Sequence, residues 1–165
     1  MVRNCIKVES LDAAIHQIIY QGECEMFTGE YYHTVDSKNR IFVPAKFREE
    51  LGESFMVVRD IREKILKVYS TEGWEEYLAP IKRQERRLAE KALRYLHRNA
   101  SQVTPDSQGR ILIPAALLEY AEIEKEAVFV GCSSCCEIWS ANNYAAEIEG
   151  EDPEFIRQEL EKLGL

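Results

Sequence analysis

Long apolar runs are missing from this sequence, and so are the short motifs that mark the common catalytic sites. No stretch approaches the roughly 18 apolar residues that a membrane-spanning helix needs, and no basic segment precedes an apolar leader. The sequence contains neither a G-x-S-x-G nucleophile motif nor a glycine-rich phosphate loop. We therefore expect a cytoplasmic protein that is not an enzyme, with no cofactor, no membrane partner and no small-molecule substrate.

Metal-ligating and nucleophilic side chains are few. The three histidines are dispersed, and the five cysteines are irregularly spaced, although Cys132, Cys135 and Cys136 form a C-x-x-C-C cluster. A zinc site usually needs four tetrahedral ligands, and no second cysteine pair or nearby histidine completes such a set. We expect small buried or turn thiols and no metal; the alternatives are redox sensing, a disulfide, or a metal shared between subunits.

Positive charge is also scarce overall, since the net charge is −8, but it is unevenly distributed. Residues 77–99 contain seven Lys or Arg and two Glu, whereas residues 147–165 contain seven acidic and two basic residues. The average therefore does not exclude nucleic acid as a partner. A basic segment of this kind contacts DNA in some proteins, but it is more often a solvated helix face.

The sequence does contain an internal repeat with an offset of 70 residues. Asp36–Ala45 (DSKNRIFVPA) aligns with Asp106–Ala115 (DSQGRILIPA), and the same offset pairs Val58 with Val128. Two copies of about 45 residues are each too small to bury a good core. We therefore expect the two copies to close one shared core.

Each copy predicts a strand, a turn, a second strand, a short helix and a hairpin, so the expected fold class is α+β and mainly β. Asn39 and its counterpart Gly109 are residues that tolerate the left-handed backbone of a tight turn. Pro44 and Pro114 suit the start of a helix, and Gly52 suits its end. The expected strands are 31–35, 40–43, 55–59, 65–69, 127–130 and 136–139.

Five segments follow from these patterns. The repeats, 26–76 and 100–146, are joined by a basic amphipathic helical connector at 77–99, a helix of about five turns. Residues 147–165 predict a weak acidic C-terminal helix over 148–165. Residues 1–25 form an N-terminal extension with two interpretations: an amphipathic helix over 11–19, or sequence upstream of a true start at Met26.

The differences between the repeats place three cations in the first copy at positions where the second copy has neutral residues. Lys38, Lys46 and Arg48 in the first copy correspond to Gln108, Ala116 and Leu118 in the second. An arginine among such cations can contact phosphate or a guanine edge, for which its forked donors are suited. The candidate DNA-binding residues are Arg40, Lys38, Asn39, Lys46 and Arg48, with a weaker contribution from Arg110 and Gln108.

The aspartates four residues before these arginines have a structural interpretation. A turn aspartate accepts backbone N–H bonds within its own turn or pairs with a nearby arginine. Because both Asp and Arg recur in both copies, we assign Asp36, Asp106 and Gly109 to the structure of the turns. The same structural interpretation is stronger for Arg110 than for Arg40, because Arg110 lacks the neighbouring cations.

These segments together resemble the MraZ family of bacterial transcriptional regulators. The resemblance rests on Met26–Gly29 (MFTG), Val35–Arg40 (VDSKNR), Val43-Pro44 with Phe47–Glu49, and Asp106–Pro114 (DSQGRILIP). It extends over about residues 26–148 and, with two matched copies, is far more specific than a single D-x-x-x-R motif. Asn39 departs from the glycine that is usual in that family.

The resemblance implies an AbrB-like fold in which two hairpin-bearing halves interlock into a double-split β-barrel. It implies ring-shaped homo-oligomers that bind double-stranded DNA at short G-containing direct repeats, with Arg40 as a contacting residue. It further implies repression of the promoter of the division and cell-wall gene cluster, and association with the nucleoid. The alternative is an antitoxin-like AbrB-fold module that binds a protein partner.

Overall fold

The structure is a computed structural model that describes residues 26–165. The helix expected over 11–19 and the question of a start at Met26 lie outside the described residues. The eight strands of the described part are β1 (Glu30–Thr34), β2 (Arg40–Phe42), β3 (Phe55–Arg59), β4 (Leu66–Ser70), β5 (Ala100–Val103), β6 (Arg110–Leu112), β7 (Glu126–Gly131) and β8 (Cys136–Ser140). Its six helices are α2 (Ala45–Leu51), α3 (Thr71–Lys82), α4 (Arg86–Arg98), α5 (Ala115–Tyr120), α6 (Ala141–Gly150) and α7 (Pro153–Lys162).

The strands form two antiparallel sheets, which confirms the expected α+β class. Six strands are ordered β1-β7-β8-β4-β3-β5, and β2 pairs with β6 in a separate two-stranded ribbon. The first strand of each repeat therefore pairs with a strand of the other repeat: β1 with β7, and β5 with β3. Strands β4 and β8 join the two halves in the middle of the larger sheet. Neither repeat completes its own sheet.

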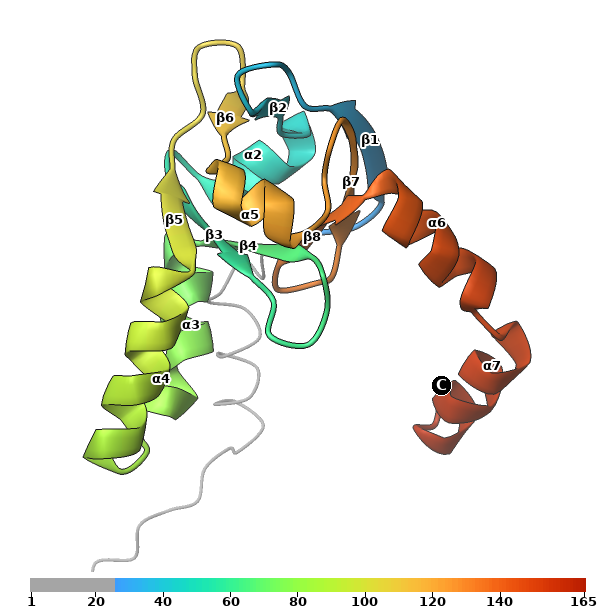
Figure 1. The fold of residues 1–165 in the computed structure, drawn as a ribbon. Helices are drawn as coiled ribbons and strands as arrows, with labels where there is room; N and C mark the ends of the chain where they lie inside the picture. The colour runs from blue at the N-terminus through green and yellow to red at the C-terminus, as the bar shows by residue number, and fades with distance from the viewer. Residues whose placement is uncertain (1–25) are drawn as a thin grey trace, which may run out of the picture.

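The two repeats also share one core, as expected. Phe47 and Phe55 from the first repeat and Ile111 and Phe129 from the second are fully buried in a single apolar cluster between the ribbon, α2, α5 and the large sheet (Figure 1). A second, smaller cluster lies on the α3–α4 side of the molecule and contains Val58, Tyr69, Trp74, Leu78, Leu96 and Cys135.

Short local signals set the ends of the elements. The side chains of Ser70 and Ser140 accept hydrogen bonds from the backbone N–H groups of Gly73 and Asn143, at 3.0 and 3.2 Å, and so cap α3 and α6. Gly52 ends α2 with a φ of 77°, a conformation that favours glycine. Each repeat therefore continues into a helix after its hairpin. The expected segment boundaries, after residues 76 and 146, fall inside these two helices, α3 and α6.

The single helical connector expected over 77–99 is wrong. Helices α3 and α4 are separate, and the side chain of Glu85 caps α4 by accepting from the N–H of Arg87 at 3.1 Å. The break has a packing reason, because Leu78 from α3 and Leu96 from α4 are both buried in the smaller cluster. A helical hairpin lets both apolar faces reach that cluster, whereas one straight helix would carry Leu96 away from it.

The helix expected over 148–165 is also wrong in its bounds. Helix α6 ends at Gly150 and α7 begins at Pro153, after Asp152, whose side chain accepts from the N–H groups of Glu154 and Phe155. Helix α7 projects away from the sheets (Figure 1). No helix among residues 26–165 is long and apolar enough to cross a membrane.

Candidate nucleic-acid interface

The turn before β2 is built around the carboxylate of Asp36. Its Oδ1 accepts from the backbone N–H groups of Lys38 and Arg40, at 2.8 and 2.9 Å. Its Oδ2 accepts from Arg40 Nε at 2.8 Å and lies 2.7 Å from Arg40 Nη2. Asn39 supplies the left-handed residue, with a φ of 59°. Asp36 thus performs both structural roles that its position predicts, bonding the turn and pairing with the arginine.

The turn before β6 has the same construction. Asp106 Oδ1 accepts from the N–H groups of Gln108 and Arg110, and its Oδ2 lies 2.9 Å from Arg110 Nε and 2.7 Å from Nη2. Gly109 takes the left-handed position, with a φ of 81°. The hydrogen bonds from the arginine side chains lower the pKa of both aspartates from 3.8 to about 2. Both carboxylates are therefore charged throughout the physiological range.

The ribbon brings the two turns together on one surface. Arg40 pairs with Leu112 and Phe42 with Arg110, and bonds from Val43 N–H to Gly109 O and from Ile113 N–H to Asn39 O extend the ladder at each end. Side chains alternate between the faces of a strand, so Arg40 and Arg110 lie on the outer face while Ile41 and Ile111 are buried. Both turns rise at the same end of the molecule (Figure 1).

Arg48 has a structural position that the sequence did not predict. Its Nε donates to Val43 O at 3.2 Å, and its guanidinium covers the second turn, where a Cβ atom at Gly109 would lie 2.7 Å from Arg48 Cζ. The two turns therefore differ for a reason: Gly109 leaves room for Arg48. In the other half, the position equivalent to Gly109 is occupied by the larger Asn39, and the position equivalent to Arg48 is occupied by the smaller Leu118.

The remaining candidate residues are dispersed around this surface. Lys38 is exposed at the tip of the first turn, and the equivalent Gln108 is exposed in the second. Lys46 is exposed on α2, with its Nζ donating to Thr28 Oγ1 at 2.7 Å. The basic connector lies elsewhere, because α3 and α4 extend from the opposite end of the molecule from the turns (Figure 1). The arginines of α4 therefore do not add to the surface of the ribbon.

Phe42 and Leu112 were missed as candidates, although a signal for them was present. Both are exposed on the outer face of the ribbon, beside the two arginines. The alternation in R-I-F-V-P and R-I-L-I-P places the first and third residues of each strand on the same face. That pattern predicts a large apolar side chain next to each turn arginine.

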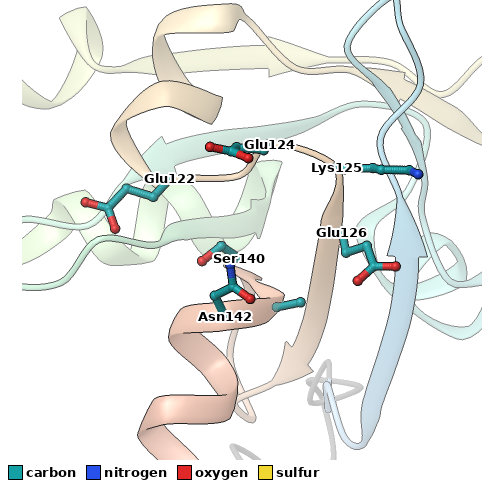
Figure 2. Close-up of a pocket in the computed structure, with 7 residues that line it drawn as sticks. Glu122, Glu124, Lys125, Glu126, Ser140 and Asn142 are labelled. Atoms are coloured by element: carbon teal, nitrogen blue, oxygen red, sulfur yellow. The ribbon is translucent and has the colours of Figure 1, made fainter.

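The described residues also line cavities away from the ribbon. A cavity of about 340 Å³ beside the start of α6 is lined by Glu122, Glu124, Lys125, Glu126, Ser140, Ala141 and Asn142. Figure 2 shows the carboxylates of Glu122 and Glu126 pointing in opposite directions, so they do not form an acid–base pair. Within the described residues, no group of three or more His, Cys, Asp or Glu side chains is arranged to hold a metal ion.

The cysteine cluster lies at the turn between β7 and β8. Cys132 is exposed, whereas Cys135 and Cys136 are buried, and all three are free thiols. Partial desolvation by its neighbours and the nearby carboxylate of Glu137 raise the pKa of Cys132 to about 12, and burial raises the pKa values of Cys135 and Cys136. Reactive cysteines have lowered pKa values, so these residues have the properties of structural thiols.

The fold and the ribbon together define a class: two-repeat α+β proteins whose repeats exchange strands and present two arginine-bearing turns side by side. The family model described as "MraZ protein, putative antitoxin-like" matches residues 26–99 and 96–159. The chain therefore belongs to the MraZ family, as its motifs indicated.

Three relatives illustrate the similarity, and each is named "Transcriptional regulator MraZ". The protein of Caldicellulosiruptor bescii is 42% identical over 147 residues, which cover 85% of this chain and 100% of the relative. The protein of Clostridium tetani is 40% identical over 146 residues, with the same coverage of both chains. The protein of Moorella thermoacetica is 41% identical over 121 residues, covering 72% of this chain and 84% of its own.

The packing of Arg48 on Gly109 predicts a measurable coupling between the repeats. Gly109→Asn should destabilise the protein by about 1 kcal/mol, because the new side chain displaces Arg48 and breaks its bond to Val43 O. Arg48→Leu should lose the same bond. The double variant should therefore lose about 1 kcal/mol rather than the sum, as measured by urea denaturation.

The matched control is Asn39→Gly combined with Arg48→Leu. Asn39 lies in the other turn, so this pair should be additive, and Asn39→Gly alone should change stability by less than about 1 kcal/mol. Additivity of Gly109→Asn with Arg48→Leu would show that the close approach has no energetic weight.

The pKa values of the turn aspartates give a second prediction. A carboxyl whose folded-state pKa is depressed stabilises the fold above its usual pKa, and this contribution disappears as the pH falls from 3.8 towards about 2. An NMR titration of the side-chain carboxyl carbons should give pKa values of about 2 for Asp36 and Asp106. Arg40→Lys removes the fork and should raise the pKa of Asp36 towards 3.8, while Asp106 in the same spectrum stays unchanged. A pKa near 3.8 for both aspartates in the unsubstituted protein would contradict the turn geometry.

Proposed function

We propose that this protein is a DNA-binding transcriptional regulator without enzymatic activity, and that the β2–β6 ribbon is its reading surface. The observation that carries the proposal is the position of Arg40 and Arg110 on the outer face of one ribbon, where their side chains are 31% and 21% exposed. A two-stranded ribbon fits the major groove of B-DNA, which is about 12 Å wide. The names of the relatives support a role in transcription.

The ion pair at each turn favours base recognition by the arginine. Asp36 occupies the Nε and Nη2 side of the Arg40 guanidinium and fixes its orientation. The opposite edge, formed by Nη1 and the second hydrogen of Nη2, can bind guanine O6 and N7 in a bidentate manner. Arg110 has the same arrangement with Asp106. The first turn contributes more because exposed Lys38 adds a phosphate contact that neutral Gln108 does not provide.

We propose the finer details of this function from the resemblance to the family. The protein represses the promoter of the division and cell-wall gene cluster, in the cytoplasm at the nucleoid, and recognises short G-containing direct repeats. Its strands form the AbrB-like double-split arrangement. The exchange of β1 and β5 between repeats supports this arrangement, because interlocked halves need such an exchange.

The protein acts as a homo-oligomeric ring, and its charge distribution supports a particular contact between copies. The basic hairpin α3–α4 and the acidic arm α6–α7 extend from different sides of the molecule (Figure 1). Residues 77–99 have a net charge of +5 and residues 147–165 a net charge of −5. The two segments are held apart within one chain, so the acidic arm of one copy meets the basic hairpin of the next.

Exposed apolar side chains lie within both charged segments. Helix α7 exposes Phe155, Ile156 and Leu160, and α4 exposes Leu88 and Tyr95. Burial of such residues stabilises a contact that the charges orient. Because the two surfaces differ, the contact is head-to-tail, and a head-to-tail contact that closes on itself produces a ring. A ring repeats the ribbon at fixed spacing, which suits direct-repeat operators through effective concentration.

The asymmetry between the turns predicts unequal effects of two substitutions. Arg40→Ala should abolish specific binding to the DNA upstream of its own gene, with a loss of roughly 10- to 100-fold per guanine contact, because the fork is removed. Arg110→Ala should weaken binding less. Gln108→Lys should increase nonspecific affinity and steepen the salt dependence by about one phosphate contact. Fluorescence anisotropy at fixed salt measures all three.

Arg62→Ala is the control, because Arg62 is an exposed arginine in the loop between β3 and β4, outside both the ribbon and the basic hairpin α3–α4. It should leave DNA affinity unchanged. Equal losses for Arg40→Ala and Arg110→Ala would mean that both turns contribute alike, and a larger loss for Arg110→Ala would overturn the preference for the first turn.

The proposed contact between copies predicts a charge-reversal experiment. The unsubstituted protein should sediment well above its monomer mass of 19.1 kDa. Lys91→Glu with Arg94→Glu on α4 should shift the protein towards monomer, because these residues would then repel the acidic arm. Glu159→Lys with Glu161→Lys on α7 should do the same, and the four substitutions together should restore the large species.

The alternative, an antitoxin-like module, makes a different prediction in the same measurement. A protein partner on the exposed face of α7 would co-purify in stoichiometric amount, and the free chain would sediment as a monomer. A monomeric, partner-free protein at micromolar concentration would exclude the ring and its gain in effective concentration.

A further inference from the structure

Two large apolar side chains are exposed on the outer face of the β2–β6 ribbon. Phe42 is 46% exposed and Leu112 is 58% exposed. Both are third residues of their strands, and the ladder places Leu112 opposite Arg40 and Phe42 opposite Arg110. Each repeat therefore contributes one arginine and one apolar residue to the same small surface.

The core does not account for this pattern. Ile41 and Ile111 fill the inner face of the ribbon and are completely buried, so the outer residues are not needed to close the core. A single exposed apolar residue on a protein surface needs no explanation. Here the same kind of residue occurs at equivalent positions of both repeats, between two cations, on the surface proposed to read DNA.

The electrostatics of the ribbon are suited to a nucleic acid. The guanidinium of Arg110 lies over the ring of Phe42, 5.8 Å from its centroid, so this cation is held beside an apolar surface. An apolar patch bordered by cations matches the major groove, where the thymine C5-methyl group is an apolar feature beside phosphates and guanine acceptors.

The spacing of the ribbon also fits neighbouring base pairs. Opposite residues of an antiparallel pair have Cβ atoms about 4.5–5.5 Å apart, and successive bases along a strand rise by about 3.4 Å. An arginine and its cross-strand neighbour can therefore reach the same base step or the next one.

We propose that Phe42 and Leu112 are specificity-determining residues that contact thymine methyl groups beside the guanines bound by Arg110 and Arg40. This inference rests on the proposed function, because it requires the ribbon to lie in the major groove. The pairing follows the ladder: Leu112 reads the thymine next to the guanine of Arg40, and Phe42 reads the thymine next to the guanine of Arg110.

Replacing thymine by uracil tests the inference, because it removes only the methyl group. The probe is a DNA duplex from the region upstream of the gene. Each thymine in the segment that the protein covers is replaced in turn by uracil. Uracil at a contacted position should weaken binding by the unsubstituted protein roughly fourfold, the effect of one buried methyl group. Phe42→Ala and Leu112→Ala should each weaken binding to the thymine duplex by a similar factor.

The decisive result is the coupling between protein and DNA changes. Phe42→Ala should bind the thymine and uracil duplexes with equal affinity at the position whose methyl group Phe42 contacts. Leu112→Ala should bind the two duplexes with equal affinity at a different position, the one that Leu112 contacts. The slope of affinity against salt should stay unchanged in both variants, because no phosphate contact is lost. Ile61→Ala is the control, since Ile61 is 58% exposed in the loop between β3 and β4.

Other outcomes separate this inference from the proposed function. Uracil without effect at every position, or losses in Phe42→Ala and Leu112→Ala that are equal on thymine and uracil duplexes, would overturn the methyl contacts while leaving DNA binding intact. A change in sedimentation mass in both variants would assign the two residues to a protein interface and would also overturn the inference. Absence of sequence-specific binding by the unsubstituted protein would remove the proposed function itself.

Discussion

The exchange of strands between the repeats is the constraint on which the other features of this molecule depend. The outer strands β1 and β5 find their hydrogen-bond partners in the opposite repeat, and the ribbon takes one strand from each repeat. The ribbon therefore cannot form within one half. Because it is antiparallel, related positions of the two repeats face the same side. The exchange thus converts two similar sequence segments into a single surface with two arginines.

The structure of the D-x-x-x-R turn and the DNA contact proposed for its arginine involve the same ion pair. The Asp36 carboxylate bonds the turn and holds one side of the Arg40 guanidinium, and this leaves the other side of a fixed fork for a ligand. An arginine held in this manner loses less conformational entropy on binding than a free one. The position of Arg48 over Gly109 adds a second link, because the first repeat's helix α2 supports the second repeat's turn.

Much of the fold could be predicted from the sequence, because the signals involved are local. Asp36, Asn39 and Pro44 specify a turn and a helix start through short-range chemistry, and the 70-residue offset shows that the arrangement occurs twice. The partners of β1 and β5 could not be predicted from the residues. Alternating apolar residues indicate which face of a strand is buried, but they do not indicate which other strand pairs with it. The break at Glu85 was missed for a similar reason: the apolar residues from Ile81 to Leu96 lie at helical spacing, and only the position of the smaller cluster requires a hairpin. Arg48 was grouped with the surface cations because its contact, Gly109, is distant in sequence.

The strand exchange also has a consequence for the biogenesis of the chain. Glu30 of β1 pairs with Val130 of β7, so the first strand must wait for about 100 further residues to be synthesised. At translation rates of about 5–20 residues per second, this delay lasts roughly 5–20 s. During that time the emerging first repeat has strands without partners and an apolar face that only the second repeat can cover. The first repeat therefore cannot complete its sheet until the C-terminal half of the chain has been synthesised.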